Sequence, residues 1–287
     1  VGIHPHKIHG RRALHRPMAL PPQAAASSEL VAALRKTLAD ELAGYPHSAV
    51  MISAYGGSHR CFERFLIARQ KDVVEAAVMF RETLAWRAKH GLDDGTFHID
   101  ESLRERVKAM WPGQYAPSTT PCGSPMQLFR PGNADPRGML AAFTEAEFET
   151  FYIWWMEESL MLQNKANASS IDVPDSPWSG MLEVYDMAGL SLTQLYPPAL
   201  AMLARVLSIG QAHYPENLRK LYLLNSPYTF TGAWMVVSAV LSANTLAKIT
   251  MTSYDGGDEL RDAVGGPEKL VEFMAIVDPP SRGWFTT

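Results

Sequence analysis

Two side chains that together suit a phosphate group stand near the end of the most apolar part of the chain. Residues 242–251 read SANTLAKITM, and Thr245 and Lys248 stand three residues apart in this segment. On a helix that spacing places both side chains on one face. A lysine supplies positive charge and a threonine hydroxyl supplies a directional hydrogen bond, which is a sound pairing for phosphate. A lysine at a helix C-terminus also interacts favourably with the helix dipole, so the pair alone leaves a purely structural role open.

The sequence offers no set of residues with the makeup of a catalytic centre. Glu157 and Glu158 are adjacent, so on a helix they point about 100° apart and make a poor acid–base couple. There is no GxSxG, HExxH, CxxC or P-loop motif, and no nucleophile can be paired with a base. The histidines His4, His6 and His9 suit a metal by type, but their place in a tail argues against a metal site. We therefore predict a protein that is not an enzyme and has no metal or cofactor.

The composition is typical of a globular protein with a sizeable core. The chain has 287 residues, of which 47% are hydrophobic, and a net charge of -4. This mild acidity argues against nucleic acid as a partner, because broad nucleic-acid binding favours a strongly basic surface. Two cysteines, Cys61 and Cys122, are too few for a disulfide framework and indicate a reducing compartment. The longest apolar run, 232–243, is shorter than the roughly 18 residues that span a bilayer.

Changes in composition and in the spacing of apolar residues divide the chain into four parts. Residues 1–27 contain basic residues, histidines and prolines but no acidic residue, which predicts a disordered basic tail or the remains of an organelle-targeting segment. Residues 28–94 repeat apolar residues at helical spacing and predict a helical N-terminal module. Residues 95–277 alternate strands with helices and predict an α/β domain with a mostly parallel sheet. Residues 278–287 are a C-terminal tail.

The expected strands and helices of the α/β part follow from its apolar runs. We predict three strands within residues 180–189, 218–227 and 248–254, and one continuous helix over 234–248. Four prolines between residues 112 and 125 predict extended or loop backbone.

Two long stretches resemble one protein family. Residues 65–91, FLIARQKDVVEAAVMFRETLAWRAKHG, resemble the helical N-terminal module of the CRAL-TRIO (Sec-fourteen-like) lipid-transfer proteins. Residues 213–249, HYPENLRKLYLLNSPYTFTGAWMVVSAVLSANTLAKI, resemble the lipid-binding centre of that family. The second stretch has the Tyr-Pro-Glu turn, the strand closed by Asn-x-Pro, the gate helix and the Thr-x-x-Lys ending. Two shorter segments, VYDMAGLSL and PEKLVEF, resemble further parts of the same family. The likeness spans roughly residues 58–275.

The resemblance implies a fold and a function. An all-helical N-terminal module would precede a mixed, mostly parallel sheet that floors a lipid pocket closed by a helical lid. The protein would bind one phospholipid, above all phosphatidylinositol, and transfer it between membranes or present it there. It would act in the cytoplasm with transient peripheral contact to a membrane surface, although the basic tail leaves an organelle open. In a presenting role its partner would be a lipid kinase.

The same resemblance assigns four residues to the lipid headgroup. Thr245 and Lys248 would meet the phosphate of phosphatidylinositol, and Arg69 would join the same site. Glu216 would accept hydrogen bonds from the inositol hydroxyls.

The apolar segment that precedes Thr245 fits the lid. Residues 232–241 read GAWMVVSAVL, and as a lid they would swing onto a bilayer. Phe230 and Trp234 would then enter the membrane interface, and Gly232 would act as a hinge. The alternative is that this segment is only a buried core helix.

Several positions depart from the family pattern. Met181 and Glu183 stand where members that also take phosphatidylcholine have small hydroxyl residues, which argues against phosphatidylcholine as a second ligand. Gln70 and Asn217 replace expected basic residues. Two alternatives therefore stay open: a carrier of a hydrophobic small molecule such as a tocopherol, retinoid or isoprenoid-like compound, and a lipid-sensing regulatory module for a lipid kinase.

Overall fold

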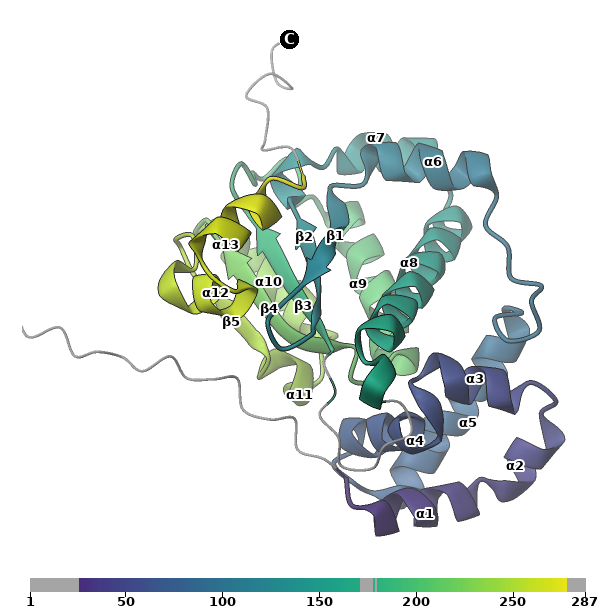
Figure 1. Cartoon of the computed structure of the whole chain (residues 1–287). Coiled ribbons are helices and arrows are strands. Elements are labelled where there is room, and N and C mark those ends of the chain that lie inside the picture. The colour runs from purple at the N-terminus through teal and green to yellow at the C-terminus, as the bar shows by residue number, and fades with distance from the viewer. Residues whose placement is uncertain (1–25, 171–177, 179, 278–287) are drawn as a thin grey trace, which may run out of the picture.

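The computed structural model describes residues 26–170, 178 and 180–277. The predicted tails, 1–27 and 278–287, lie outside the described residues except for Ala26 and Ser27. Within the described residues, a group of helices packs beside a five-stranded sheet with helices on both of its faces (Figure 1). The predicted α/β fold class is confirmed.

Five helices form the N-terminal part of the structure. They are α1 (Ser28–Thr37), α2 (Ala39–Gly44), α3 (Ser48–Ala54), α4 (Gly57–Ala68) and α5 (Val73–Lys89). Ser27 begins α1, since its hydroxyl accepts a hydrogen bond from the backbone nitrogen of Leu30. Asp72 begins α5 by accepting from the backbone nitrogens of Val74 and Glu75 at 2.8 and 3.0 Å. Such caps satisfy amide groups that the first helical turn leaves without a partner.

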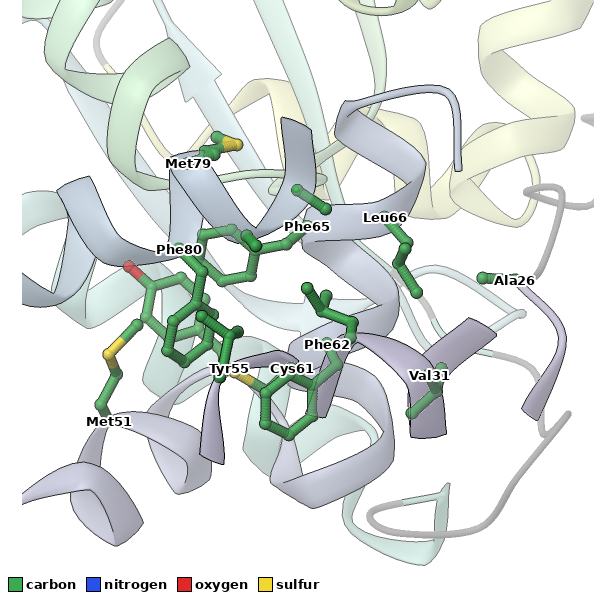
Figure 2. Close-up of a cluster of buried hydrophobic side chains, with 14 of the residues drawn as sticks. Ala26, Val31, Met51, Tyr55, Cys61, Phe62, Phe65, Leu66, Met79 and Phe80 are labelled. Atoms are coloured by element: carbon green, nitrogen blue, oxygen red, sulfur yellow. The ribbon is translucent and has the colours of Figure 1, made fainter. Parts of the chain in front are cut away.

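Three phenylalanines form the centre of the N-terminal core (Figure 2). Phe62 and Phe65 come from α4 and Phe80 comes from α5. The Phe80 ring centroid lies 5.4 Å from that of Phe62 and 5.0 Å from that of Phe65. Burial of a phenylalanine contributes roughly 1.5–3 kcal/mol, so this cluster fixes α4 and thereby the position of Arg69 at its end.

The sheet contains its five strands in sequence order. They are β1 (Gly113–Thr119), β2 (Pro125–Phe129), β3 (Met181–Asp186), β4 (Leu218–Leu224) and β5 (Ile249–Met251). β1 and β2 pair antiparallel, and all other neighbours pair parallel.

β3, β4 and β5 are the three strands that the sequence predicts. The β1–β2 hairpin is not among them, because prolines lower strand propensity. Pro117 lies where the β1–β2 register shifts and Pro125 is the first residue of its strand, both tolerated positions.

Helices cover both faces of the sheet (Figure 1). The helices after the N-terminal part are α6 (Glu101–Met110), α7 (Pro136–Ala142), α8 (Glu145–Ala166), α9 (Pro197–His213), α10 (Phe230–Ala239), α11 (Ala243–Leu246), α12 (Gly257–Val264) and α13 (Pro267–Met274). Two single 3-10 turns are η1 (Pro131–Asn133) and η2 (Ala168–Ser170). α12 and α13 pack Leu260, Val264 and Phe273 onto one face of the sheet. Since side chains alternate along a strand, the other set of strand residues faces α8, α9 and α10.

The continuous helix predicted over 234–248 is wrong. The chain leaves α10 after Val240 and forms one further helical turn, α11. Ser242 is extended, and its hydroxyl accepts a hydrogen bond from the backbone nitrogen of Thr245 at 3.1 Å, which starts the new turn. Lys248 lies beyond α11, immediately before β5. Thr245 and Lys248 therefore do not share a helix face.

Candidate functional site

A cavity of about 370 Å³ lies between the sheet and helices α8, α9 and α10. The strand register aligns one floor residue from each strand: Tyr115, Gln127, Glu183, Leu221 and Ile249. This row is polar on β1, β2 and β3 and apolar on β4 and β5. A cavity of this size with a mainly apolar lining and few polar groups is typical of a site for a small molecule or cofactor.

The walls of the cavity are aromatic and aliphatic. They include Tyr152 and Trp155 of α8, Leu203, Val206 and Leu207 of α9, and Phe230, Trp234 and Val237 of α10. The Trp155 ring stacks on Tyr115 with centroids 4.3 Å apart. The Phe230 and Trp234 rings lie 6.1 Å apart. Such a lining suits the hydrocarbon part of a ligand, because apolar surface is stabilised by leaving water.

Helix α10 covers the cavity with one apolar face and presents a second apolar face outward. Phe230 and Val237 are buried, whereas Met235 and Val236 are 68% and 41% exposed. Tyr228, just before the helix, is 93% exposed. The alternative of a buried core helix is therefore wrong. Exposed apolar patches of this kind mark sites of contact with membranes or other molecules.

Two of the three predicted lid residues face inward in this structure. Phe230 is buried and Trp234 is half-buried, and both line the cavity. Their contact with a membrane would require α10 to move. Gly232 is exposed, and a Cβ atom built on it would meet no atom within 4 Å. Packing does not demand a glycine there, and the hinge stays a prediction.

A buried ion pair lies at the edge of the cavity where β4 and β5 begin. Lys248 Nζ is 2.9 Å from Glu216 Oε2, and the side chains are 13% and 6% exposed. Asn244 Nδ2 donates a hydrogen bond to the other carboxylate oxygen, Glu216 Oε1. In this structure the positive charge of Lys248 is therefore matched by Glu216.

Thr245 is oriented by a glutamine from another helix. Its hydroxyl donates to Gln211 Oε1 at 3.1 Å and lies 2.9 Å from the Ser242 hydroxyl. Gln211 belongs to α9, and its Oε1 also accepts from the backbone nitrogen of Ser242 at 2.9 Å. Gln211 thus ties α11 to α9 and sets the direction of the Thr245 hydroxyl.

The turn that carries Glu216 is held from two sides. Glu216 has φ of 55°, a left-handed conformation that residues other than glycine rarely adopt. Arg64, a buried side chain of α4, donates from Nε to the Pro215 carbonyl at 2.9 Å. On the other side Asn217 Nδ2 donates to the Ser159 hydroxyl at 3.1 Å. A hydrogen bond from a charged group contributes about 1.5–3 kcal/mol, which is comparable to the roughly 1–3 kcal/mol cost of such a backbone conformation.

Arg69 reaches the same cavity from the N-terminal part. It caps the end of α4 and is half-buried. Its Nη1 donates to the carbonyl of Ala68 at 3.4 Å, and no carboxylate in the described part of the chain pairs with it. Gln70 and Lys71 follow with φ of 53° and 67°, which ends α4 abruptly. Unlike Lys248, Arg69 therefore presents a positive charge that no carboxylate among residues 26–170, 178 and 180–277 matches.

All four residues assigned to the headgroup line this same cavity: Arg69, Glu216, Thr245 and Lys248. The structure pairs Glu216 directly with Lys248 and joins Thr245 to them only through α11 and its neighbours. Their role toward a lipid headgroup stays a prediction. None of the described helices is both long enough and apolar enough to cross a membrane.

Comparison with known proteins decides the family. A family model described as the CRAL/TRIO domain matches residues 113–273, which is more than half of the chain. The chain belongs to the CRAL-TRIO domain family. The match runs from β1 into α13, so it includes the whole sheet and leaves out the N-terminal helices that carry Arg69.

This CRAL-TRIO protein is similar to several curated proteins. It is 30% identical over 197 residues to a CRAL-TRIO domain-containing protein of Caenorhabditis elegans, which covers 68% of this chain and 26% of that protein. It is 27% identical over 212 residues to the SEC14 cytosolic factor of Eremothecium gossypii, with 73% and 67% covered. It is 25% identical over 220 residues to the phosphatidylinositol/phosphatidylcholine transfer protein SFH11 of Arabidopsis thaliana, with 76% and 57% covered. The chain thus spans about a quarter of the worm protein and about half of the plant protein.

A solved structure shares the fold over most of the chain. The crystal structure of Sfh5 matches with a TM-score of 0.66 and 15% sequence identity. The match covers 88% of this chain and 92% of that chain, more than the domain model covers. At this identity the likeness concerns the fold alone.

A second group of polar side chains lies in the floor of the cavity of this CRAL-TRIO protein. Glu183 of β3 is surrounded by Tyr185 of the same strand, Tyr115 of β1 and Tyr152 of α8. Burial raises the pKa of Glu183 to about 7, and a hydrogen bond with Tyr185 opposes this rise. Burial also raises the pKa of the three tyrosines, so their hydroxyls stay protonated at neutral pH.

Sequence reasoning missed several partners of the predicted site residues. Ser242 and Asn244 lie in the same short segment as Thr245, so their polar character within an apolar region was a usable signal. Gln211 gave no such signal, because it lies in a different helix and meets Thr245 only in the folded protein. Glu183 was noted only as a departure from the family pattern, and its place in the cavity comes from the strand register.

Proposed function

We propose that this CRAL-TRIO protein encloses one phospholipid, phosphatidylinositol, and transfers it between membranes or presents it there, without catalysing a reaction. The observation that carries the proposal is that Arg69, Thr245 and Lys248 all line one otherwise largely apolar cavity. A lipid with an anionic phosphate and two acyl chains suits both regions at once. The relative named as a phosphatidylinositol/phosphatidylcholine transfer protein supports this assignment.

The apolar lining would lower the main energetic barrier to lipid transfer. Two acyl chains contain about 30 CH₂ groups at roughly 0.8 kcal/mol each, so exposing them to water costs on the order of 20 kcal/mol. Spontaneous exit from a bilayer is therefore slow. A carrier must offer a comparably dry chamber before the chains leave the membrane, and Val206, Leu221 and Phe230 belong to such a lining here.

The charges at the cavity edge would recognise the headgroup. An ammonium group has three N–H donors, so Lys248 is able to keep Glu216 and bind a phosphate oxygen at the same time. Thr245 would add a directional donor and Arg69 a second positive charge. Glu216 would accept hydrogen bonds from inositol hydroxyls with its carboxylate oxygens.

The test of this proposal replaces Lys248 and Thr245 by alanine in one variant. We expect phosphatidylinositol transfer between vesicles to be lost. Because the change also leaves Glu216 without its ion-pair partner, transfer is measured well below the lowered midpoint of thermal unfolding, where circular dichroism shows that the variant is folded. Lys36→Ala is the matched control, since Lys36 is an exposed lysine on α1. Unchanged transfer in the double variant would end the proposal.

Two further measurements separate the proposed function from its rivals. Mass spectrometry of lipid that copurifies with the protein identifies the ligand class, and a tocopherol, retinoid or isoprenoid would contradict phosphatidylinositol as ligand. A vesicle assay separates transport from presentation. Tight binding with negligible transport would support presentation, for which a lipid kinase is the expected partner.

A further inference from the structure

The hydrogen bonds around Thr245 end on one side chain, Gln211 of α9. The Thr245 hydroxyl and the backbone nitrogen of Ser242 both donate to Gln211 Oε1, at 3.1 and 2.9 Å. A backbone N–H group can only donate, so the amide oxygen of Gln211, and not its nitrogen, faces α11. All three residues line the cavity, and together with the ion pair of Glu216 and Lys248 they form its polar edge.

Neither hydroxyl of this group has a hydrogen left for a ligand. A hydroxyl carries one hydrogen, and Thr245 gives its hydrogen to Gln211. In its contact with the Ser242 hydroxyl at 2.9 Å, Thr245 therefore accepts and Ser242 donates. Ser242 Oγ accepts in turn from the backbone nitrogen of Thr245 at 3.1 Å. The hydrogens of both hydroxyls thus lie along a chain of hydrogen bonds that ends at Gln211.

Lys248 differs from Thr245 in this respect. An ammonium group has three N–H donors, so Lys248 donates to Glu216 and keeps donors for a phosphate oxygen. The single hydrogen of the Thr245 hydroxyl cannot serve two acceptors in the same way. Because an ionised phosphate oxygen only accepts, Thr245 donates to a phosphate only after its hydrogen bond to Gln211 is broken.

We propose that Gln211 sets the affinity of the polar edge for phospholipids, because its Oε1 competes with the lipid phosphate for the hydrogen of Thr245. This inference rests on the proposed function, in which a lipid phosphate reaches Thr245. The exchange favours an anionic oxygen, since hydrogen bonds to charged groups are roughly twice as strong as those between neutral groups. Gln211 Oε1 keeps its hydrogen bond from the Ser242 backbone nitrogen, so the exchange does not leave it unpaired.

The position of Gln211 on α9 suits this role. Leu207 and Gln211 stand one turn apart, share one face of α9 and both line the cavity. α9 packs against α5, α8 and α10, which fixes its backbone. Rotation of the Thr245 hydroxyl about its Cβ–Oγ1 bond is enough to redirect the hydrogen. The exchange therefore requires no movement of a helix.

Gln211→Met is the first test, because methionine has a similar shape and its sulfur is only a weak acceptor. The protein is equilibrated with phosphatidylcholine vesicles of graded phosphatidylinositol content and reisolated, and its bound lipid is quantified by mass spectrometry. We expect the affinity for phosphatidylinositol to rise about fivefold, since no hydrogen bond to Gln211 has to be broken. Gln114→Met is the matched control, since Gln114 is an exposed glutamine on β1.

The stability of Gln211→Met distinguishes competition from a merely structural role. We expect a lower midpoint of thermal unfolding, because the Ser242 backbone nitrogen loses its acceptor. A purely structural Gln211 would lower the affinity together with the stability. Tighter binding by a less stable protein is expected only if Gln211 opposes the ligand.

The same change in a Thr245→Val background shows whether Gln211 acts through Thr245. Valine keeps the branched shape of threonine and lacks the hydroxyl, so Gln211→Met frees no hydrogen there. We expect Thr245→Val to bind more weakly than the parent protein, and Gln211→Met to change the affinity of that background by less than about twofold. A fivefold gain that persists without the hydroxyl would overturn the inference.

Gln211→Glu provides the decision if Gln211→Met does not fold. A carboxylate still accepts from Ser242 and Thr245, so this variant keeps both hydrogen bonds. It holds the Thr245 hydrogen more strongly than an amide does, and phosphatidylinositol affinity should fall about tenfold. The fall should be smaller in the Thr245→Val background. An equal fall in both backgrounds would reflect charge repulsion alone and contradict the inference.

A second set of vesicles, with phosphatidic acid in place of phosphatidylinositol, separates this inference from the proposed function. If the parent protein binds phosphatidylinositol and Gln211→Met binds it no more tightly, the inference fails and the proposed function stands. If the parent binds phosphatidic acid but no phosphatidylinositol, and Gln211→Met binds phosphatidic acid more tightly, the inference stands and the proposed function fails. If the parent binds neither lipid, both fail.

Discussion

At the scale of single residues, two cations that line the cavity differ in their partners among the described residues. Lys248 pairs with Glu216 at 2.9 Å, whereas Arg69 makes a long hydrogen bond to the Ala68 carbonyl. A guanidinium presents several donors in a planar fork that suits phosphate oxygens. Arg69 therefore has more to gain from an incoming phosphate than Lys248, although it comes from the N-terminal part of the chain.

Replacement of Arg69 by alanine should weaken phosphatidylinositol binding with little effect on stability. A lost charge-assisted hydrogen bond corresponds to about 1.5–3 kcal/mol, or roughly 10-fold to 150-fold in affinity. Arg69→Lys should recover part of the affinity, because it keeps the charge without the fork. Titration with phosphatidylinositol in vesicles measures the effect, with Arg35→Ala on the exposed side of α1 as control. An affinity of Arg69→Ala equal to that of the control would contradict this role.

At the scale of helices and strands, the spacing of apolar residues predicts that a helix or strand is present better than it predicts where a helix ends. The strands β3, β4 and β5 follow from their apolar runs. The break between α10 and α11 does not, because a serine inside an apolar run either continues a helix or caps a new one. Here the hydrogen bond from the Ser242 backbone nitrogen to Gln211 favours the cap. That contact belongs to the tertiary structure, so no local pattern reports it.

The site was predictable to the extent that its residues belong to recognisable segments. Thr245, Lys248, Glu216 and Arg69 came from the resemblance, and all four line the cavity. The ion pair between Lys248 and Glu216 forms because β4 and β5 begin side by side. Arg69 comes from the end of α4 and forms no such pair among the described residues. The place of Glu183 in the cavity floor depends in the same way on the alignment of three strands. Sequence spacing does not encode such convergence between distant segments.

The outward face of α10 should mediate contact with a bilayer. Met235 is 68% exposed on this face, and its burial in a membrane would contribute roughly 1.5–3 kcal/mol. Met235→Asp should therefore lower both vesicle binding and lipid transfer by about tenfold or more. Cosedimentation with vesicles and a transfer assay measure the two effects.

A matched control exists on another helix of the same protein. Met161 on α8 is 55% exposed, so Met161→Asp places the same charge at a similarly exposed methionine. We expect this control to bind vesicles as the parent protein does. Equal losses in both variants would show that the effect is one of net charge and not of the α10 surface.

At the scale of the whole molecule, a buried arginine joins the N-terminal helices to the cavity. Arg87 of α5 lies 2.7 Å from Asp93 and 2.8 Å from Glu157 of α8, and its side chain is 1% exposed. The Tyr214 hydroxyl donates to the same Glu157 oxygen at 2.8 Å. Tyr214 stands two residues before Glu216, so this network connects the N-terminal part to the turn at the polar edge.

Replacement of Arg87 should destabilise the protein far more than replacement of a surface arginine. Arg87→Met leaves the Asp93 carboxylate buried without its partner, and loss of one member of a buried pair costs about 3–5 kcal/mol. Arg81→Met is the control, because Arg81 pairs with Glu41 while its side chain is 43% exposed, and such surface pairs contribute at most about 1 kcal/mol. Urea unfolding followed by circular dichroism gives both free energies of unfolding. The total free energy of unfolding of a protein is about 5–15 kcal/mol, so this loss is a large part of it. The Arg87 variant should therefore unfold at a lower urea concentration than the parent protein and lose phosphatidylinositol transfer near that concentration. Equal losses of stability in the two variants would show that the buried network does not hold the N-terminal helices to the sheet.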